Sequence, residues 1–370
     1  MESLGLEWSW TMTRLLLVLI VICSLLIACS SGRRSFDNGG LYPIMSQDRK
    51  WGYIDKAGNV VIQPQFERAR IFSEGLASVS VDGNRYGYID KSGTFVINPQ
   101  YDEARSFSEG LAVVISDGKV GYIDTKGKVV ITPQFERAYG DTGLSYSFSE
   151  GLAAVRAGDK CGYIDKTGKF IVNPQFQECL PFYGKLAPVR ADDKWGYIDR
   201  SGAISIAAQF DKAFPFTYGL GLVKIGRKYG YIDPAGKIVI NPQFDTATPF
   251  SDEGIAGVRM SGKWGGIDTA GKMVINPQFD GNTDPSQEGN IFAEVIIHDL
   301  GRITFSEGLA SVRTGDKSGY IDKNGNYVIN PQFELAFPFV GGLALVVGGG
   351  PQRQIGWIDK TGKYVWKSTG

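Results

Sequence analysis

Short apolar segments alternate with polar, glycine-containing turns along the chain from residue 41 onward. The apolar segments are rich in β-branched residues, as at 60–62 (Val-Val-Ile) and 238–240 (Ile-Val-Ile). Such runs are typical of strands, and they are too short and too often interrupted by glycine for helices. A proline follows most of these triplets, and proline lacks the backbone donor that strand pairing needs. The pattern predicts an all-β protein.

One tetrapeptide, Gly-Tyr-Ile-Asp, recurs through the chain and marks a repeat. Most copies stand 34 or 35 residues apart, and longer intervals of 41, 54 and 37 residues indicate insertions near 139–147, 281–302 and 348–354. Two copies are variants, Gly-Gly-Ile-Asp at 265–268 and Gly-Trp-Ile-Asp at 356–359. The nine copies begin at Gly52, Gly87, Gly121, Gly162, Gly196, Gly230, Gly265, Gly319 and Gly356.

Each repeat divides into three strands: a Leu-Ala-x-Val segment such as 76–79, the tetrapeptide, and the apolar triplet. We therefore expect tandem three-stranded β-meander repeats. Closed β-propellers usually have four to eight blades of four strands, whereas nine units of three strands are predicted here. The first unit begins with a first strand at 41–45 and the last ends with a third strand at 364–366, so no unit is divided between the termini. These features favour an open superhelical array, with a closed β-propeller as the alternative.

The aspartate of the tetrapeptide is followed three residues later by glycine in every copy. This spacing suits a type I turn, in which the carboxylate accepts backbone amides and the glycine takes a positive φ. A metal or acid–base array would need several copies to converge, whereas turn chemistry already accounts for each carboxylate. The predicted structural turn residues are Asp55, Gly58, Asp90, Gly93, Asp124, Gly127, Asp165, Gly168, Asp199, Gly202, Asp233, Gly236, Asp268, Gly271, Asp322, Gly325, Asp359 and Gly362.

The unit around Gly52 carries a longer motif. Residues 50–56 are Lys-Trp-Gly-Tyr-Ile-Asp-Lys, and Pro-Gln-Phe at 64–66 and Phe-Ser-Glu-Gly-Leu-Ala at 72–77 follow in order. This motif resembles the WG repeat family of bacterial proteins, and the resemblance covers about residues 41–366. Ala208 departs from the proline of the motif, and Cys161 and Ser318 depart from its tryptophan. The resemblance implies a β-rich repeat array, often exported or surface-associated, and supplies neither catalytic residues nor a single ligand.

An apolar run of 14 residues at 15–28 follows Arg14 and ends directly before Cys29. It is short for a transmembrane helix and matches the hydrophobic region of a secretory signal. The sequence Leu-Ile-Ala-Cys at 26–29 resembles the lipobox of bacterial lipoproteins, whose cysteine is acylated after the chain is cut before it. By that resemblance residues 1–28 are a lipoprotein signal peptide, Cys29 is lipidated, 29–40 form a flexible tether and 41–370 hold the repeats. An ordinary signal peptide or an uncleaved anchor is the alternative.

Composition and charge exclude several function classes. Thirty-nine basic residues balance 39 acidic ones, so no long-range field favours nucleic acid. His298 is the one histidine, and no phosphate-binding loop, nucleophile elbow or zinc-type cysteine pair occurs. We expect no enzyme activity, no catalytic or metal site and no cofactor. Residues 280–284 resemble the start of a calcium loop, but Pro285 stands where glycine is required, so a polar turn is favoured.

Two functional hypotheses remain. The first is a non-catalytic cell-envelope lipoprotein that acts as a repeat scaffold for protein–protein binding. The alternative is glycan or peptidoglycan binding through repeated aromatic residues. Aromatic rows lining a groove would favour glycan, and aromatic residues packed between units would favour the scaffold. The expected partners are the membrane, through the lipid anchor, and protein or envelope glycan, but no nucleic acid. The expected location is the envelope, at the outer membrane in a Gram-negative host.

Two cysteines fall within one repeat. Cys161 takes the tryptophan position, and Cys179 lies 18 residues later at a position that is usually alanine. Export places both in an oxidising compartment, and a disulfide needs Cα atoms within about 7 Å. A disulfide and two separate buried thiols both stay open as possibilities. The alanines at the corresponding position are Ala69, Ala104, Ala138, Ala213, Ala247 and Ala336.

Overall fold

Strands and turns make up the protein in the computed structural model, which describes residues 39–137, 146–281, 302–349 and 354–368. No helix occurs in those ranges, so the predicted all-β fold is confirmed. The strand pairs are antiparallel, as between β1 and β2, and within each sheet the strands are ordered as in the chain. The described chain is therefore a succession of meanders.

The described strands form seven sheets, and each of the two seven-stranded sheets, β8–β14 and β27–β33, contains two repeats. The nine repeats are here called blades 1 to 9, one for each copy of the tetrapeptide. The blades, in chain order, contain β1 (Leu41–Met45), β2 (Trp51–Asp55) and β3 (Val60–Phe66); β4 (Arg68–Ala69), β5 (Ala77–Ser80), β6 (Tyr86–Ile89) and β7 (Phe95–Tyr101); β8 (Glu103–Ala104), β9 (Leu111–Ser116), β10 (Lys119–Asp124) and β11 (Val129–Glu136); β12 (Leu152–Ala157), β13 (Lys160–Asp165) and β14 (Phe170–Phe176); β15 (Glu178–Cys179), β16 (Ala187–Ala191), β17 (Lys194–Ile198) and β18 (Ile204–Phe210); β19 (Lys212–Thr217), β20 (Leu220–Ile225), β21 (Lys228–Ile232) and β22 (Ile238–Phe244); β23 (Thr246–Ala247), β24 (Ile255–Met260), β25 (Lys263–Asp268) and β26 (Met273–Phe279); β27 (Phe305–Ser306), β28 (Leu309–Thr314), β29 (Lys317–Ile321) and β30 (Tyr327–Val340); and the second half of β30 with β31 (Leu343–Gly348), β32 (Ile355–Ile358) and β33 (Tyr364–Lys367).

Most blades have four strands, one more than the sequence pattern predicts. The additional strand is short and precedes the Leu-Ala-x-Val strand; in blade 2, Arg68 pairs with Ser80 and Ala69 with Val79. The alanine of this strand is buried, as at Ala69 with 4% of its surface exposed. A run of two residues is too short to show a period in the sequence, which is why the pattern predicts only three strands.

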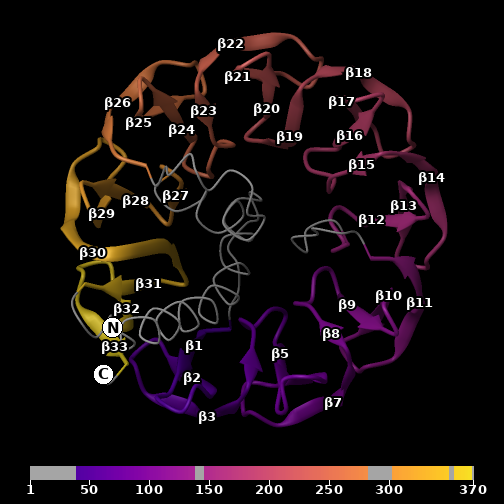
Figure 1. Ribbon diagram of the computed structural model, residues 1–370, viewed down its shortest axis with the longest axis vertical. Helices are drawn as coiled ribbons and strands as arrows, with labels where there is room; N and C mark the ends of the chain where they lie inside the picture. The colour runs from indigo at the N-terminus through magenta and orange to yellow at the C-terminus, as the bar shows by residue number, and fades with distance from the viewer. Residues whose placement is uncertain (1–38, 138–145, 282–301, 350–353, 369–370) are drawn as a thin grey trace, which may run out of the picture.

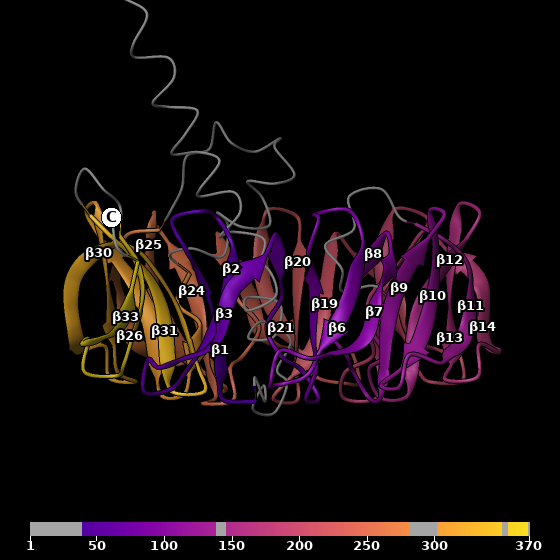
Figure 2. The same cartoon turned by 90° about the horizontal axis from the view of Figure 1, so that it is seen from below.

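The blades follow one another around a closed ring, with β33 of blade 9 beside blade 1 (Figure 1). The short first strands lie toward the centre of the ring, and strands such as β3, β7 and β22 form its rim. Seen from the side, the strands run between the two flat faces of the ring (Figure 2). This arrangement is that of a β-propeller. The preferred expectation of an open superhelical array is therefore corrected in favour of the closed alternative.

Contacts between the two ends of the chain close the ring. The indole nitrogen of Trp357 donates to the carbonyl oxygen of Pro43 at 2.9 Å, and the hydroxyl of Tyr42 donates to the carbonyl oxygen of Gly341 at 2.6 Å. The rings of Tyr42 and Trp357 pack edge to face with their centroids 5.1 Å apart. One apolar cluster contains both residues, together with Leu343. Complete end units therefore do not imply an open array, because the first and last blades pack on each other as whole sheets.

Seven of the seams between blades are filled by the tyrosine of the tetrapeptide. Tyr53, for example, is fully buried, and its hydroxyl donates to the carbonyl oxygen of Arg70 in blade 2 at 2.6 Å. Its ring packs against Phe72 with centroids 4.9 Å apart. The hydroxyl bond satisfies the one polar atom of a large buried side chain. The same bond is made by Tyr88, Tyr122, Tyr163, Tyr197, Tyr231 and Tyr320.

Candidate functional site

The nine turn aspartates each serve their own turn. In blade 1 one oxygen of Asp55 accepts the amides of Ala57 and Asn59, both at 2.9 Å, and the amide of Gly58 donates to the carbonyl oxygen of Asp55. Gly58 has φ 90°, a conformation that a side chain disfavours. The same pair of amide bonds occurs at Asp90, Asp124, Asp165, Asp199, Asp233, Asp268, Asp322 and Asp359.

These hydrogen bonds favour the charged carboxylate. The pKa of Asp55 is lowered mainly by the hydrogen bond from the side chain of Asn59, and the pKa of Asp90 mainly by that from Ser92. Among the described residues, no group of three or more His, Cys, Asp or Glu side chains is placed to hold a metal ion. The chemistry of the recurrent aspartates is thus that of turn formation, repeated once in each blade.

The glycine that opens the tetrapeptide allows a close backbone approach. A Cβ atom on Gly52 would lie 2.5 Å from the carbonyl oxygen of Ile62 and 2.6 Å from the nitrogen of Pro64. Both atoms belong to the neighbouring strand β3, whose pairing with β2 shifts register at this point. The glycine is therefore required by backbone packing inside the blade.

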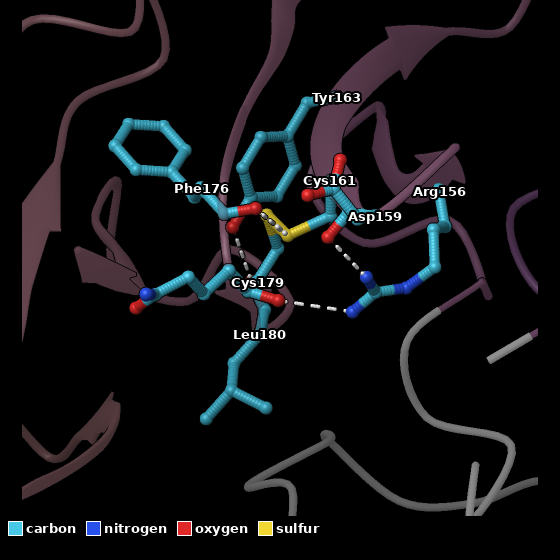
Figure 3. Close-up of a disulfide and its surroundings, with 8 residues drawn as sticks. Arg156, Asp159, Cys161, Tyr163, Phe176, Cys179 and Leu180 are labelled. Carbon is cyan, nitrogen blue, oxygen red and sulfur yellow. Dashed lines mark hydrogen bonds between the residues drawn. A yellow bond between two sulfur atoms is a disulfide. The ribbon is translucent and has the colours of Figure 1, made fainter. Parts of the chain in front are cut away.

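A disulfide joins two neighbouring blades. Cys161 on β13 of blade 4 is bonded to Cys179 on β15 of blade 5, with Cα atoms 6.1 Å apart (Figure 3). Both side chains are buried in the apolar cluster that also holds Tyr163 and Phe176. In other blades the corresponding positions hold a large and a small residue, such as Trp51 and Ala69. The disulfide thus takes the place of a packing contact between blades.

The linking segment Phe-Ser-Glu-Gly carries contacts that the sequence analysis did not assign. The hydroxyl of Ser73 donates to the carbonyl oxygen of Phe107 at 2.8 Å, and the carboxylate of Glu74 accepts the amide of Gly110 at 2.9 Å. Both bonds cross from blade 2 to blade 3. The recurrence of this segment in the sequence could have indicated its structural role. Equivalent bonds between blades are made by Ser108, Glu109, Ser149, Glu150, Ser306 and Glu307.

An ionic cluster on the inner strands spans blades 2 to 4. Glu103 on β8 lies 3.7 Å from Arg70, 3.2 Å from Arg105 and 2.8 Å from Arg137. Burial opposes ionisation of Glu103, but the positive charges of Arg105, Arg70 and Arg137 outweigh it and lower the pKa of the carboxyl. Within the described ranges, Glu103 is the one acid that three arginines contact, so no repeat pattern could reveal the cluster.

Some residues named in the sequence analysis lie outside the described ranges: Cys29, Ala138, His298 and residues 282–285 of the calcium-like segment. Asp280, at the start of that segment, is described. Its carboxylate pairs with Lys263 and accepts the amide of Gly315 at 3.0 Å. No helix in the described part of the chain is long and apolar enough to cross a membrane.

Many of the exposed apolar side chains belong to the outermost strands of the blades and not to the tetrapeptide strands. The first residues of the outermost strands are exposed, for example Val61 on β3, Val130 on β11 and Val239 on β22. The aromatic residues of the motif are packed instead, and Trp51, Trp195 and Trp264 each expose less than a tenth of their surface. Repeated aromatic residues therefore hold the seams together and do not form rows on the surface.

Comparison with solved structures shows similarity of fold. A crystal structure described as that of the eukaryotic initiation factor matches with a TM-score of 0.61 and 14% identity, covering 89% of this chain and 96% of that chain. BamB from Moraxella catarrhalis matches with a TM-score of 0.45 and 12% identity, covering 72% of this chain and 87% of that chain. At 14% identity the first of these similarities concerns the fold alone. A comparison with curated proteins gave no match.

Comparison with protein families gives a match along most of the chain. A family described as WG containing repeat matches eight successive segments. The last tetrapeptide, at 356–359, is not within a matched segment, although β31, β32 and β33 around it form the same kind of sheet. The matched segments are 51–84, 86–119, 121–161, 162–195, 195–229, 229–264, 264–296 and 319–350. The chain belongs to the WG containing repeat family.

Proposed function

We propose that this protein is a non-catalytic lipoprotein of the bacterial cell envelope that acts as a scaffold for protein–protein binding. The observation that supports this most is the burial of the motif aromatics. Tyr53 and its equivalents are buried between blades, and their hydroxyl groups donate hydrogen bonds to the next blade. What remains for partners is a rigid ring with a varied polar surface, and repeat arrays use such extended surfaces for binding.

Glycan binding through repeated aromatic residues is the weaker proposal. It would need aromatic faces open to solvent at the repeat spacing, so that sugar rings could stack on them. The motif tyrosines and tryptophans are buried instead. Tyr218 is exposed over 56% of its surface, but it stands where other blades have glutamate or glycine and is not part of a repeated row.

The lipid anchor is part of the same proposal. Leu-Ile-Ala-Cys at 26–29 supports acylation of Cys29. Several acyl chains on one residue would hold the protein at a bilayer, since each buried methylene contributes about 0.8 kcal/mol. The residues between Cys29 and blade 1 would then act as a tether of roughly 35 Å at full extension.

The anchor is tested with Cys29→Ser. We expect this variant to lose labelling by a fatty-acid probe and to leave the membrane fraction, with Cys23→Ser as the matched control that keeps both. Labelling of Cys29→Ser at the wild-type level would reject the anchor.

The scaffold function is tested by capture from envelope extract with residues 30–370 as bait. We expect specific proteins to be retained. The same bait, unfolded by heat, serves as the control. Retention of purified peptidoglycan, with no protein retained above the control, would reject protein scaffolding in favour of the glycan alternative.

A further inference from the structure

A cation recurs at the end of the second strand in five successive blades. The position follows the Leu-Ala-x-Val segment and holds Arg156, Arg190, Lys224, Arg259 and Arg313 in blades 4 to 8. In blades 5 to 7 a residue of the short first strand lies directly across the sheet from this cation. Directly opposed side chains on one face have Cβ atoms about 4.5–5.5 Å apart, so their charges interact.

Blade 5 balances this cation with an acid. Glu178 on the short strand β15 is the cross-strand partner of Arg190. The guanidinium of Arg190 contacts the carboxylate of Glu178 at 2.5 Å. Blade 7 has a neutral residue at the same place, Thr246 opposite Arg259. An acid or a neutral residue thus faces the cation in the two blades next to blade 6.

Blade 6 places two lysines opposite each other. Lys212 on β19 is the cross-strand partner of Lys224 on β20. Like charges in this position destabilise a sheet, so the pair works against the stability of the blade. Both strands lie on the inner side of the ring (Figure 1), and Lys212 is exposed. Arg227, in the hairpin after β20, is also exposed and adds a third positive charge.

The carboxylate beside the lysine pair already has partners. Asp211 accepts Lys194 at 2.5 Å and the amide of Gly226 at 2.6 Å, one on each oxygen. Asp211 is close enough to feel the charge of Lys224, but it cannot balance Lys194, Lys212 and Lys224 together. A net positive charge therefore stays in this corner of blade 6.

An aromatic surface adjoins the lysines. Lys224 stands over the ring of Tyr229, with its nitrogen 5.6 Å from the centroid, and Tyr229 is its partner across the sheet. Phe214 packs against Tyr229 with centroids 6.5 Å apart, and both rings are only partly buried. The cation–π contact holds the Lys224 ammonium in place. The corner thus offers positioned positive charge next to apolar surface.

We propose that the corner formed by Lys212, Phe214, Lys224, Arg227 and Tyr229 binds an acidic segment of a partner protein. Carboxylates of the partner would neutralise the opposed lysines, and an apolar side chain beside them would pack on Phe214 and Tyr229. This proposal specifies an acidic protein partner for the scaffold, and it therefore rests on the proposed function. Functional positions commonly retain such locally unfavourable residues, and replacing them stabilises the fold while binding is lost.

The test compares charge reversals in two adjacent blades. Lys212→Glu gives blade 6 the charge pair of blade 5, and Glu178→Lys gives blade 5 the opposed cations of blade 6. Each variant of residues 30–370 is titrated with fluorescent poly-L-glutamate at low salt, and its thermal midpoint is measured. We expect Lys212→Glu to bind about tenfold more weakly or worse while its midpoint stays the same or rises. We expect Glu178→Lys to have a lower midpoint without loss of binding.

Unchanged poly-L-glutamate binding by Lys212→Glu would overturn the proposal. A parallel fall in the thermal midpoint of that variant would also overturn it, because Lys212 would then be structural. Vesicles containing phosphatidylglycerol are titrated alongside, and Lys212-dependent binding to vesicles without binding to the peptide would replace the protein partner by a lipid surface. Equal capture of envelope proteins by wild type and Lys212→Glu would leave the scaffold function standing and reject this site alone.

Discussion

The indole nitrogen of Trp357 donates to the carbonyl oxygen of Pro43 across 2.9 Å, although 314 positions separate the two residues in the chain. In seven other blades a tyrosine hydroxyl bonds to the next blade instead, for example to the residue that follows β4 or β8. Blade 1 has β1 as its first described strand, and Trp357 of blade 9 donates its hydrogen bond to Pro43 in β1. The exchange of tyrosine for tryptophan is thus matched to the one seam that joins the two ends of the chain.

Replacing Trp357 tests this closing contact. We expect Trp357→Phe to lower the free energy of unfolding by about 1–3 kcal/mol, because the buried carbonyl of Pro43 loses its donor. Urea unfolding measures the change. Trp366→Phe, at a half-buried position on β33, is the control and should cost less. Equal costs for the two variants would show that the bond to Pro43 contributes nothing specific.

The turn glycines are tested with Gly236→Val. Gly236 has φ 82°, and a Cβ there would lie 3.1 Å from a methyl group of Ile206 in the preceding blade. We expect a loss of at least about 1–3 kcal/mol, because a β-branched residue is strained at positive φ. Gly226→Val is the matched variant for strain alone, since Gly226 has φ 62° with no atom within 4 Å, and Gly236→Val should cost more because of the added contact with Ile206. A thermal midpoint that is unchanged in Gly236→Val would contradict this account of the turn.

The disulfide is tested chemically and by substitution. Unreduced, alkylated protein that lacks Cys23 and Cys29 should show no alkylation at Cys161 or Cys179 by mass spectrometry. Two alkylated thiols in periplasmically expressed protein would rule the bond out. Reduction should lower the free energy of unfolding by about 3 kcal/mol in the chain-entropy description of an 18-residue loop.

A matched pair of variants separates the bond from simple packing. Cys161→Ser with Cys179→Ser should be less stable than the oxidised wild type. Cys161→Trp with Cys179→Ala introduces the residues that blade 1 and blade 2 have at Trp51 and Ala69. We expect this second variant to recover part of the lost stability through packing. If stability is not recovered, the seam between blades 4 and 5 accommodates the disulfide but not the tryptophan–alanine pair.

The turn aspartates predict how stability depends on pH. The pKa is lowered in the folded protein at Asp55, Asp90, Asp165, Asp199, Asp322 and Asp359. A carboxyl with a lowered folded-state pKa stabilises the fold above its unfolded pKa of about 4, and that contribution is lost as pH falls through the folded value. Urea midpoints measured from pH 6 to pH 2.5 should therefore fall below about pH 4. Constant or rising midpoints in that range would contradict the assignment.

The sequence pattern predicts much of a single blade and little of the ring. Gly-Tyr-Ile-Asp repeats locate the strands and turns, because strand type and turn chemistry are local properties. The two-residue strand at Arg68–Ala69 has no period, and it is recognised only through its pairing with β5. Closure depends on a small rotation between successive blades that accumulates around the array, and no single repeat encodes it. Tyr42 and Trp357 mark the closing seam only once both are seen in contact.

The candidate binding corner was hidden for a different reason. Lys212 and Lys224 stand at positions of the repeat where charge is common, so neither residue is unusual by itself. Their opposition follows from the pairing of β19 with β20, and β19 contains the strand that the pattern omits. The relation therefore requires the register of the sheet.

Small-angle X-ray scattering of residues 30–370 tests the central claim, that nine blades close into one ring, most directly. A closed ring is compact, and its radius of gyration should lie near or slightly above the value of roughly 20 Å expected for a globular chain of this length. The pair-distance distribution should end sharply and fit a flat annulus. An open superhelical array would give a clearly larger radius and a long tail at large distances, and that result would contradict the closed ring.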